Sequence, residues 1–166
     1  MEISAQGLDL IKRSEGFRSR QYLDVAGYAT IGYGHRVIPP ESFSDGITQE
    51  QATAILMNDV QQAEHAVNRL VRVPLAQGQF DALVDFCFNV GPVKLAASTL
   101  LKELNDRQYA HAGLQLLRWD YAAGLPNAAL RARRTAELQL WTGGAPEEQI
   151  AASSPTPHMQ NMAVKL

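Results

Sequence analysis

The 166-residue sequence contains one cysteine, Cys87, so no disulfide can form within the chain. No apolar run approaches the roughly 18 residues that a membrane-spanning helix needs. The amino-terminal residues do not show the charged and then apolar pattern of a secretion signal. We therefore expect a protein that is made in the cytoplasm without a leader or anchor, and whose fold does not depend on an oxidising compartment.

Clustered metal ligands are also missing. The four histidines and Cys87 are scattered, without HExxH or CxxC spacing, at His35, His65, His111 and His158. A serine nucleophile is not supported either, because the sequence contains no GxSxG. We therefore predict no metal site and no cofactor.

Two acids and a hydroxyl stand out between residues 15 and 35, which read EGFRSRQYLDVAGYATIGYGH. Glu15 follows a short amphipathic pattern, which predicts a helix that Ser4 can cap. The negative end of a helix disfavours the ionised form of a carboxyl group, which suits a general acid because it must carry a proton. Asp24 begins a turn that Gly27 can close, and Thr30 lies in the strand-like run that follows. Glycoside hydrolysis needs one acid to protonate the leaving oxygen and a second carboxylate to position water or attack the sugar.

Each of these three residues also has a simpler interpretation. Glu15 could be a solvated residue at a helix end, Asp24 could cap its own turn, and Thr30 could be an ordinary strand threonine. These roles are compatible with a site, because a residue that caps a turn can still face a cleft.

The same residues carry a family resemblance. A Glu, eight residues, an Asp, five residues and a Thr form the motif of the phage-type lysozymes of glycoside hydrolase family 24, and it falls on Glu15, Asp24 and Thr30. The flanking GYxTIGYGH matches residues 27–35, and FNVG at 88–91 with the RRxAE at 133–137 are further matching blocks. Ala129 stands where relatives commonly have glycine.

This resemblance implies an endolysin, a muramidase that hydrolyses the β-1,4 bond between N-acetylmuramic acid and N-acetylglucosamine in peptidoglycan. Glu15 would be the general acid, and Asp24 and Thr30 would stabilise the cationic transition state and position the water. Members of the T-even type are regarded as inverting. Two other interpretations stay open: a lytic transglycosylase that cleaves the same bond without water, and a peptidoglycan-binding protein without activity.

The expected fold is α+β and mostly α-helical. A hairpin lobe over about 15–45 is connected by one long helix over about 48–72 to a helical lobe over about 75–142, all in one catalytic domain of residues 1–142. Apolar residues recur every three or four positions between Ala52 and Val71, and Thr48 to Gln51 fits a capping box. Residues 143–166, rich in Ala, Pro and Ser, are expected to form a flexible tail.

The resemblance also implies contacts around the cleft. It implies that His35 pairs with Asp59 and so connects the hairpin lobe to the long helix. Tyr33, Gly34, His35 and Phe88 are expected to contact the substrate, because their motif blocks flank the cleft in relatives.

Partners follow from charge and from the resemblance. With 15 basic and 17 acidic residues, overall charge gives no argument for nucleic acid. The basic run ending at Arg134 is expected to pair with Glu137 one turn away. Contact with the anionic glycan–peptide polymer is the second interpretation, and DNA the third. The resemblance implies action on the cell wall in the periplasm, no stable membrane insertion, and dependence on a holin or another permeabiliser. We expect a monomer.

Overall fold

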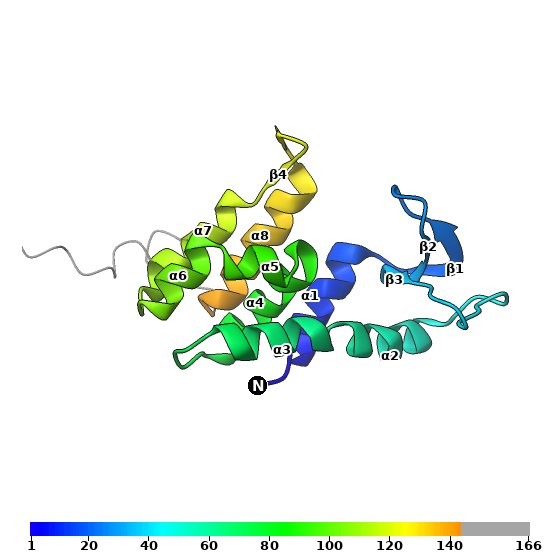
Figure 1. Ribbon diagram of the computed structural model, residues 1–166, viewed down its shortest axis with the longest axis horizontal. Helices are drawn as coiled ribbons and strands as arrows, with labels where there is room; N and C mark the ends of the chain where they lie inside the picture. The colour runs from blue at the N-terminus through cyan, green and yellow to red at the C-terminus, as the bar shows by residue number, and fades with distance from the viewer. Residues whose placement is uncertain (144–166) are drawn as a thin grey trace, which may run out of the picture.

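The structure, a computed structural model, describes residues 1–143 and consists of a small sheet and a group of helices. Figure 1 shows the first sheet at one end of the molecule, most helices at the other, and two consecutive helices running between them along one side. The main helices are α1 (Ala5–Glu15), α2 (Gln49–Asp59), α3 (Gln61–Leu70), α4 (Gln77–Val90), α5 (Pro92–Ala96), α6 (Thr99–Asn105), α7 (Tyr109–Gln115) and α8 (Ala128–Trp141), with a short 3-10 helix at Leu116–Arg118. The strands are β1 (Arg18–Leu23), β2 (Ala29–Gly32), β3 (His35–Arg36), β4 (Tyr121–Ala122) and β5 (Leu125–Pro126).

Helix α1 begins where the sequence predicts. The Ser4 side chain accepts a hydrogen bond from the Gly7 backbone N–H, at 3.3 Å, and the helix ends at Glu15. Gly16 follows with φ of 73°, a backbone conformation that glycine adopts at little cost, and its N–H donates to a carbonyl of the last turn. Although α1 precedes the hairpin in the chain, it packs against α4 and α8 in the helical lobe.

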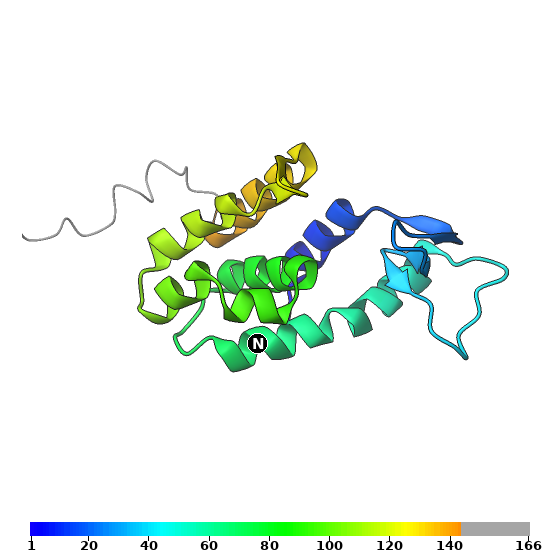
Figure 2. The same cartoon turned by 45° about the horizontal axis from the view of Figure 1, so that its top comes forward.

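The hairpin lobe is an antiparallel sheet in the order β1-β2-β3. Thr30 lies in the central strand, opposite Tyr22 of β1 and Arg36 of β3. The turn between β1 and β2 runs from Asp24 to Gly27, whose φ of 83° suits glycine. A loop between β3 and α2 extends outward from this lobe, as Figure 2 shows.

The expected single helix over 48–72 is two helices. The predicted capping box starts α2: Thr48 Oγ1 accepts from the Gln51 N–H at 3.2 Å, and Gln51 Oε1 accepts from the Thr48 N–H at 2.8 Å. The helix then stops at Asp59, and α3 starts at Gln61. Val60 between them keeps φ and ψ near helical values, −71° and −19°, so the apolar spacing continues across the interruption. Periodicity therefore could not reveal the break.

The core is divided between the lobes. The helical lobe surrounds α4, whose residues 80–87 are all buried. A smaller cluster under the sheet includes Ile11, Ile31 and Leu56, and thus joins α1, β2 and α2. Phe88 packs against both clusters. Apart from Gly143, the expected tail lies outside the described residues.

Candidate active site

Glu15 lies between the two lobes. It is the last residue of α1, and 26% of its side chain is exposed. Its Oε1 is 2.7 Å from Nη1 of Arg133 on α8, a residue 118 positions away. On the other side, a β-carbon on Gly34 of the β2–β3 turn would lie 3.8 Å from Oε2. The carboxyl therefore faces the hairpin lobe while a helix of the other lobe holds it.

Asp24 points its carboxylate into its own turn. Oδ1 accepts hydrogen bonds from the backbone N–H groups of Ala26 and Tyr28, both at 2.8 Å. This is the turn-capping role that its sequence position also allows. Because one oxygen takes both bonds, the carboxylate is fixed in direction by its own loop.

Thr30 is tied to the same turn. The side chain is buried, and Oγ1 donates to the Tyr28 carbonyl at 3.0 Å. The Asp24 backbone N–H donates to that same carbonyl at 2.9 Å. One carbonyl oxygen thus holds both residues, and Thr30 Oγ1, whose proton is used, keeps lone pairs that can accept a hydrogen bond.

The contact between Glu15 and Arg133 is not among the contacts expected from the sequence. Arg133 also binds Asp85 of α4 with two parallel hydrogen bonds, from Nε to Oδ2 and from Nη2 to Oδ1, each 2.9 Å. Burial acts to lower the pKa of Arg133, but Asp85 first and Glu15 second outweigh it and raise the pKa above its ordinary value. One sequence signal was the presence of two aspartates, Asp81 and Asp85, among the apolar residues of α4.

The expected pairing within α8 is present for both arginines: Arg133 Nε lies 3.9 Å from Glu137 Oε1, and Arg134 lies closer. Arg134 Nη2 lies 2.8 Å from Glu137 Oε1 and donates to Asn89 Oδ1 at 2.9 Å. Its guanidinium also lies over the Phe86 ring, 5.0 Å from the centroid. Both partners of the ion pair are fully buried. Arg134 therefore serves packing and leaves Arg133 as the arginine that reaches Glu15.

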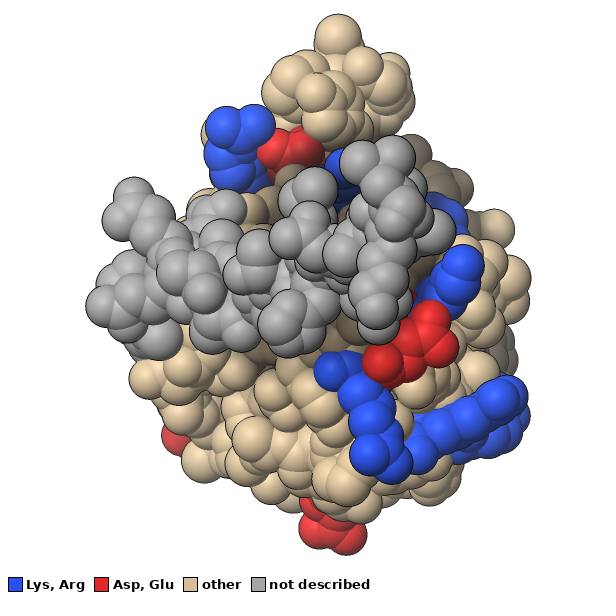
Figure 3. Space-filling model, turned by 90° about the vertical axis from the view of Figure 1, so that its left-hand side faces the viewer, with Lys and Arg blue, Asp and Glu red and all other residues tan. Residues whose placement is uncertain are grey.

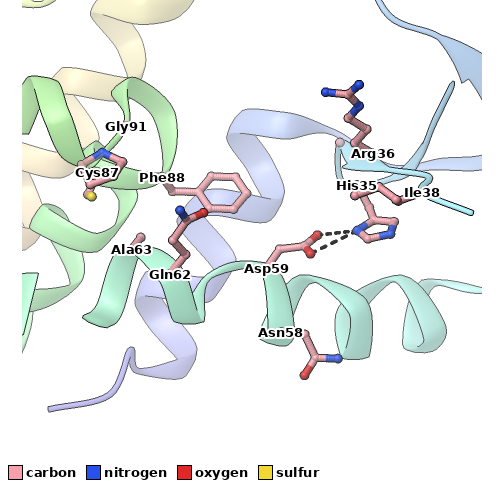
Figure 4. A pocket seen from close by; sticks show the side chains of 12 residues that line it. His35, Arg36, Ile38, Asn58, Asp59, Gln62, Ala63, Cys87, Phe88 and Gly91 are labelled. Atoms are coloured by element: carbon pink, nitrogen blue, oxygen red, sulfur yellow. Dashed lines mark hydrogen bonds and ion pairs between the residues drawn. The ribbon is translucent and has the colours of Figure 1, made fainter. Parts of the chain in front are cut away.

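A pocket of about 490 Å³ lies between the lobes and is lined by residues of β3, α2, α3 and α4. Figure 4 shows that Phe88 and Gln62 lie on one side of it and His35 on the other. Gly34 also belongs to the lining, so the pocket reaches the turn that faces Glu15. The wall thus combines an apolar ring with amide and imidazole groups.

Three of the four residues expected to contact substrate line this pocket: Gly34, His35 and Phe88. Tyr33 differs from the expectation. It is only 8% exposed, belongs to the core cluster under the sheet, and packs its ring against Phe17 with centroids 5.6 Å apart. Little of its face is left for a sugar, because its side chain points to the inner side of the lobe.

The expected contact between His35 and Asp59 is present. His35 Nδ1 lies 2.9 and 3.1 Å from the two carboxylate oxygens of Asp59, and Nε2 lies 3.1 Å from Glu41 Oε2 (Figure 4 shows the first pair). Burial acts to lower the pKa of His35, but its hydrogen bonds to Asp59 and then Glu41 outweigh burial and raise the pKa. Glu41 was not foreseen, because it lies in an irregular loop.

Charge on the end of the helical lobe is divided into separate groups. Figure 3 shows Lys and Arg side chains at several places on this face, with Asp or Glu beside some of them and uncharged surface between.

Among residues 1–143, no helix has the length and apolar character needed to cross a membrane.

Two lobes, an acid at the end of the first helix and a pocket between the lobes define a lysozyme-like protein. The family model for phage lysozyme matches residues 12–137. The endolysin of Salmonella phage P22 is 41% identical over 137 residues, which cover 81% of this chain and 94% of that protein. An endolysin from Acyrthosiphon pisum secondary endosymbiont phage 1 is also 41% identical, over 85% of this chain and 98% of its own.

Solved structures agree with these relatives. A mutant of P22 lysozyme superposes with a TM-score of 0.79 at 39% identity, covering 86% of this chain and 99% of that one. The muramidase domain of SpmX from Asticaccaulis excentricus gives 0.78 at 36% identity, with 87% and 99% covered. The chain belongs to the phage lysozyme family.

Proposed function

We propose that this protein is an endolysin that hydrolyses the β-1,4 bond between N-acetylmuramic acid and N-acetylglucosamine in peptidoglycan and so lyses the bacterial host. The observation that carries this proposal is the position of Glu15. Its Oε2 faces Gly34 of the hairpin lobe, while Arg133 of the helical lobe holds Oε1. The family membership and the endolysin relatives support the substrate class.

Glu15 acts as the general acid in this mechanism. Its proton passes to the glycosidic oxygen as the bond to the anomeric carbon breaks, and the carboxyl becomes a carboxylate. Arg133 Nη1, 2.7 Å away, donates a hydrogen bond to the carboxyl group throughout this step. The contact also fixes the rotamer of Glu15, so the proton is presented in one direction.

Asp24 and Thr30 act on the other reactant. Oδ1 of Asp24 is fixed by two backbone N–H groups, which leaves Oδ2 to face the positive charge on the sugar and to accept a proton from water. Thr30 Oγ1 donates to a carbonyl and can therefore only accept a hydrogen bond from the attacking water. Attack by water opposite the leaving oxygen would invert the anomeric centre.

The pocket holds the glycan in this proposal. Phe88 presents an apolar ring, Gly34 allows close approach of a sugar to the backbone, and His35 offers a polar edge. Because the pocket reaches from the β2–β3 turn to α4, a bound chain would contact both lobes and bring its scissile bond toward Glu15.

Mass spectrometry of purified peptidoglycan after digestion tests the proposal. The wild-type protein is expected to release fragments with reducing muramic acid ends. The rate of Glu15→Gln is expected to be about 10²- to 10⁴-fold lower, which is the usual contribution of a general acid. Asp9→Asn is the matched control, because Asp9 is an exposed acid on the same helix. Its rate is expected to equal that of the wild type.

The products also separate the other interpretations. Fragments lighter by one water, with anhydro ends, would identify a transglycosylase and leave Asp24 and Thr30 with structural roles. Binding without any fragments would identify a protein that recognises peptidoglycan but does not cleave it. Substantial turnover by Glu15→Gln would overturn the general-acid role.

The proposal extends to the organisation of the protein. We infer that residues 1–142 act as one catalytic domain, that the protein is a monomer, and that it needs a holin or another permeabiliser to reach the wall. Size-exclusion chromatography with light scattering tests the monomer. Lysis of cells with a permeabilised membrane, compared with intact cells, tests the last point, and equal lysis of both would contradict it.

A further inference from the structure

The cation that contacts Glu15 is already paired with another acid. Arg133 donates from Nε and Nη2 to the two oxygens of Asp85, both at 2.9 Å, and only Nη1 reaches Glu15. Asp85 is fully buried, so water does not compete for its oxygens. Two parallel hydrogen bonds fix the plane of the guanidinium and thereby the direction of Nη1.

A free cation at this position would work against the proposed chemistry. The general acid must hold its proton when substrate binds, whereas a positive charge 2.7 Å from Glu15 Oε1 favours the carboxylate. A cation that is neutralised by its own carboxylate still donates a hydrogen bond but exerts a much weaker field. Arg133 is only 6% exposed, so solvent screens this balance little.

We propose that Asp85 is a positioning residue for catalysis: it orients Arg133 and neutralises its charge, so that Glu15 is held in place without being forced into the ionised form. This inference rests on the proposed role of Glu15 as the general acid. Asp85 acts through Arg133 and does not touch the substrate.

The other charged groups around this pair come from α8. Glu137 Oε1 lies 2.8 Å from Nη2 of Arg134 and 3.9 Å from Nε of Arg133, so Glu137 contacts both arginines, Arg134 more closely. Burial raises the pKa of Glu137 well above its ordinary value, and a hydrogen bond with Asp85 and the charge of Asp85 add to this. The hairpin lobe contributes the uncharged Gly34 opposite Glu15. Asp85 is therefore the carboxylate of this cluster that binds Arg133 through both oxygens.

Asp85→Asn is the first test, because the side chain keeps its shape and loses its charge. Arg133 then loses its nearest counter-charge and keeps only the more distant Glu137, 3.9 Å from Nε. The alkaline limb of the kcat/KM profile against pH should therefore move to lower pH by about one unit, since a nearby opposite charge shifts a carboxyl by 1–3 units. Activity on the alkaline side should fall about tenfold, with a smaller loss on the acid side. A purely structural role would instead lower the rate by the same factor at every pH.

The double variant Asp85→Asn with Arg133→Met is the second test, and it decides the question even if the single variant does not fold. Replacing a buried ion pair by uncharged groups is often neutral for stability. The rate should fall, because Glu15 loses its hydrogen-bond donor, but the limb should stay within about 0.3 pH units of the wild type. A limb that moves up by about one unit or more would mean that Arg133 acts as a free cation, and would overturn the proposal.

A matched control is the aspartate that pairs with another arginine of α8. Asp120 is a buried aspartate that pairs with Arg131 of α8, at 2.8 Å, away from Glu15. Asp120→Asn is expected to lower the stability of the protein without moving the alkaline limb of the kcat/KM profile. Glu15→Gln separates the two proposals: if it keeps its activity, the proposed function fails. If it is inactive but the limb of Asp85→Asn does not move, only the role of Asp85 fails.

Discussion

The pair between His35 and Asp59 leads to a quantitative prediction for stability. Nδ1 of His35 carries one proton and lies 2.9 and 3.1 Å from the two oxygens of Asp59, so it makes one charge-assisted hydrogen bond that both oxygens share. The side chains are 15% and 29% exposed, which screens the pair only in part. Such a bond contributes about 1.5–3 kcal/mol to the free energy of unfolding. Glu41 on the other nitrogen is more exposed than Asp59, 40% against 29%, and should therefore contribute less.

The pH dependence has a definite sign. The pKa of His35 is raised in the folded protein, so the stabilisation is complete below the unfolded value near 6.5 and fades as pH rises through the folded pKa. Burial raises the pKa of Asp59, with His35 opposing it, so the pair also weakens at strongly acidic pH. The raised pKa of His35 indicates a strong pair, whereas the raised pKa of Asp59 does not, because a strong attraction to His35 alone would lower the pKa of Asp59. The short contact to both oxygens indicates that the pair forms wherever both groups are ionised.

Thermal unfolding followed by circular dichroism tests this reasoning with Asp59→Asn. For a domain of this size, the loss of 1.5–3 kcal/mol corresponds to a decrease in Tm of about 3–12 °C at pH 5.5. The difference from the wild type should shrink at pH 9, where His35 is neutral. Asp45→Asn, an exposed aspartate in the same lobe, is the control and should change Tm little at either pH. An equal or larger difference at pH 9 would refute the assignment of the stabilisation to a protonated His35.

Three further substitutions or modifications have clear expected outcomes. Gly78→Ala should destabilise the protein by about 1–3 kcal/mol or more in thermal unfolding, because the new β-carbon would lie 2.1 Å from the carbonyl oxygen of Leu140 on α8. Ser4→Ala should cost about 1–3 kcal/mol in the same assay, since it removes the cap of α1 and a hydrogen bond to Asp81. The Cys87 thiol, whose pKa burial raises to about 11, should not react with a thiol reagent at pH 8 until the protein is unfolded. Wild-type stability in either variant, or rapid labelling of the folded protein, would contradict the corresponding packing.

Local features of the fold were predictable from the sequence. The caps at Ser4 and Thr48 were predictable because they depend on residues three positions apart. The interruption at Val60 was not, because one irregular residue leaves the spacing of apolar side chains unchanged. The burial of Tyr33 was not either, because Tyr33 lies in the turn between β2 and β3, where strand alternation assigns it to neither face.

The site was predictable only where short motifs describe it. The His35–Asp59 contact followed from a family pattern rather than from spacing. The Glu15–Arg133 contact and its support by Asp85 join three helices, and no local rule brings such residues together. Aspartates among the apolar residues of α4 were a signal, because a buried carboxylate needs a partner, but Asp81 and Asp85 find different ones.

The separation of Glu15 and Arg133 by 118 positions has a consequence for the time at which activity can begin. A ribosome adding 5–20 residues per second needs about 6–24 s to make the chain between them. Until α8 has emerged, α1 lacks one of the helices on which it packs, and the acid has no guanidinium to hold it. The proposed active site is therefore completed by the last described helix, and a chain interrupted before Arg133 would carry Glu15 without the guanidinium that holds it.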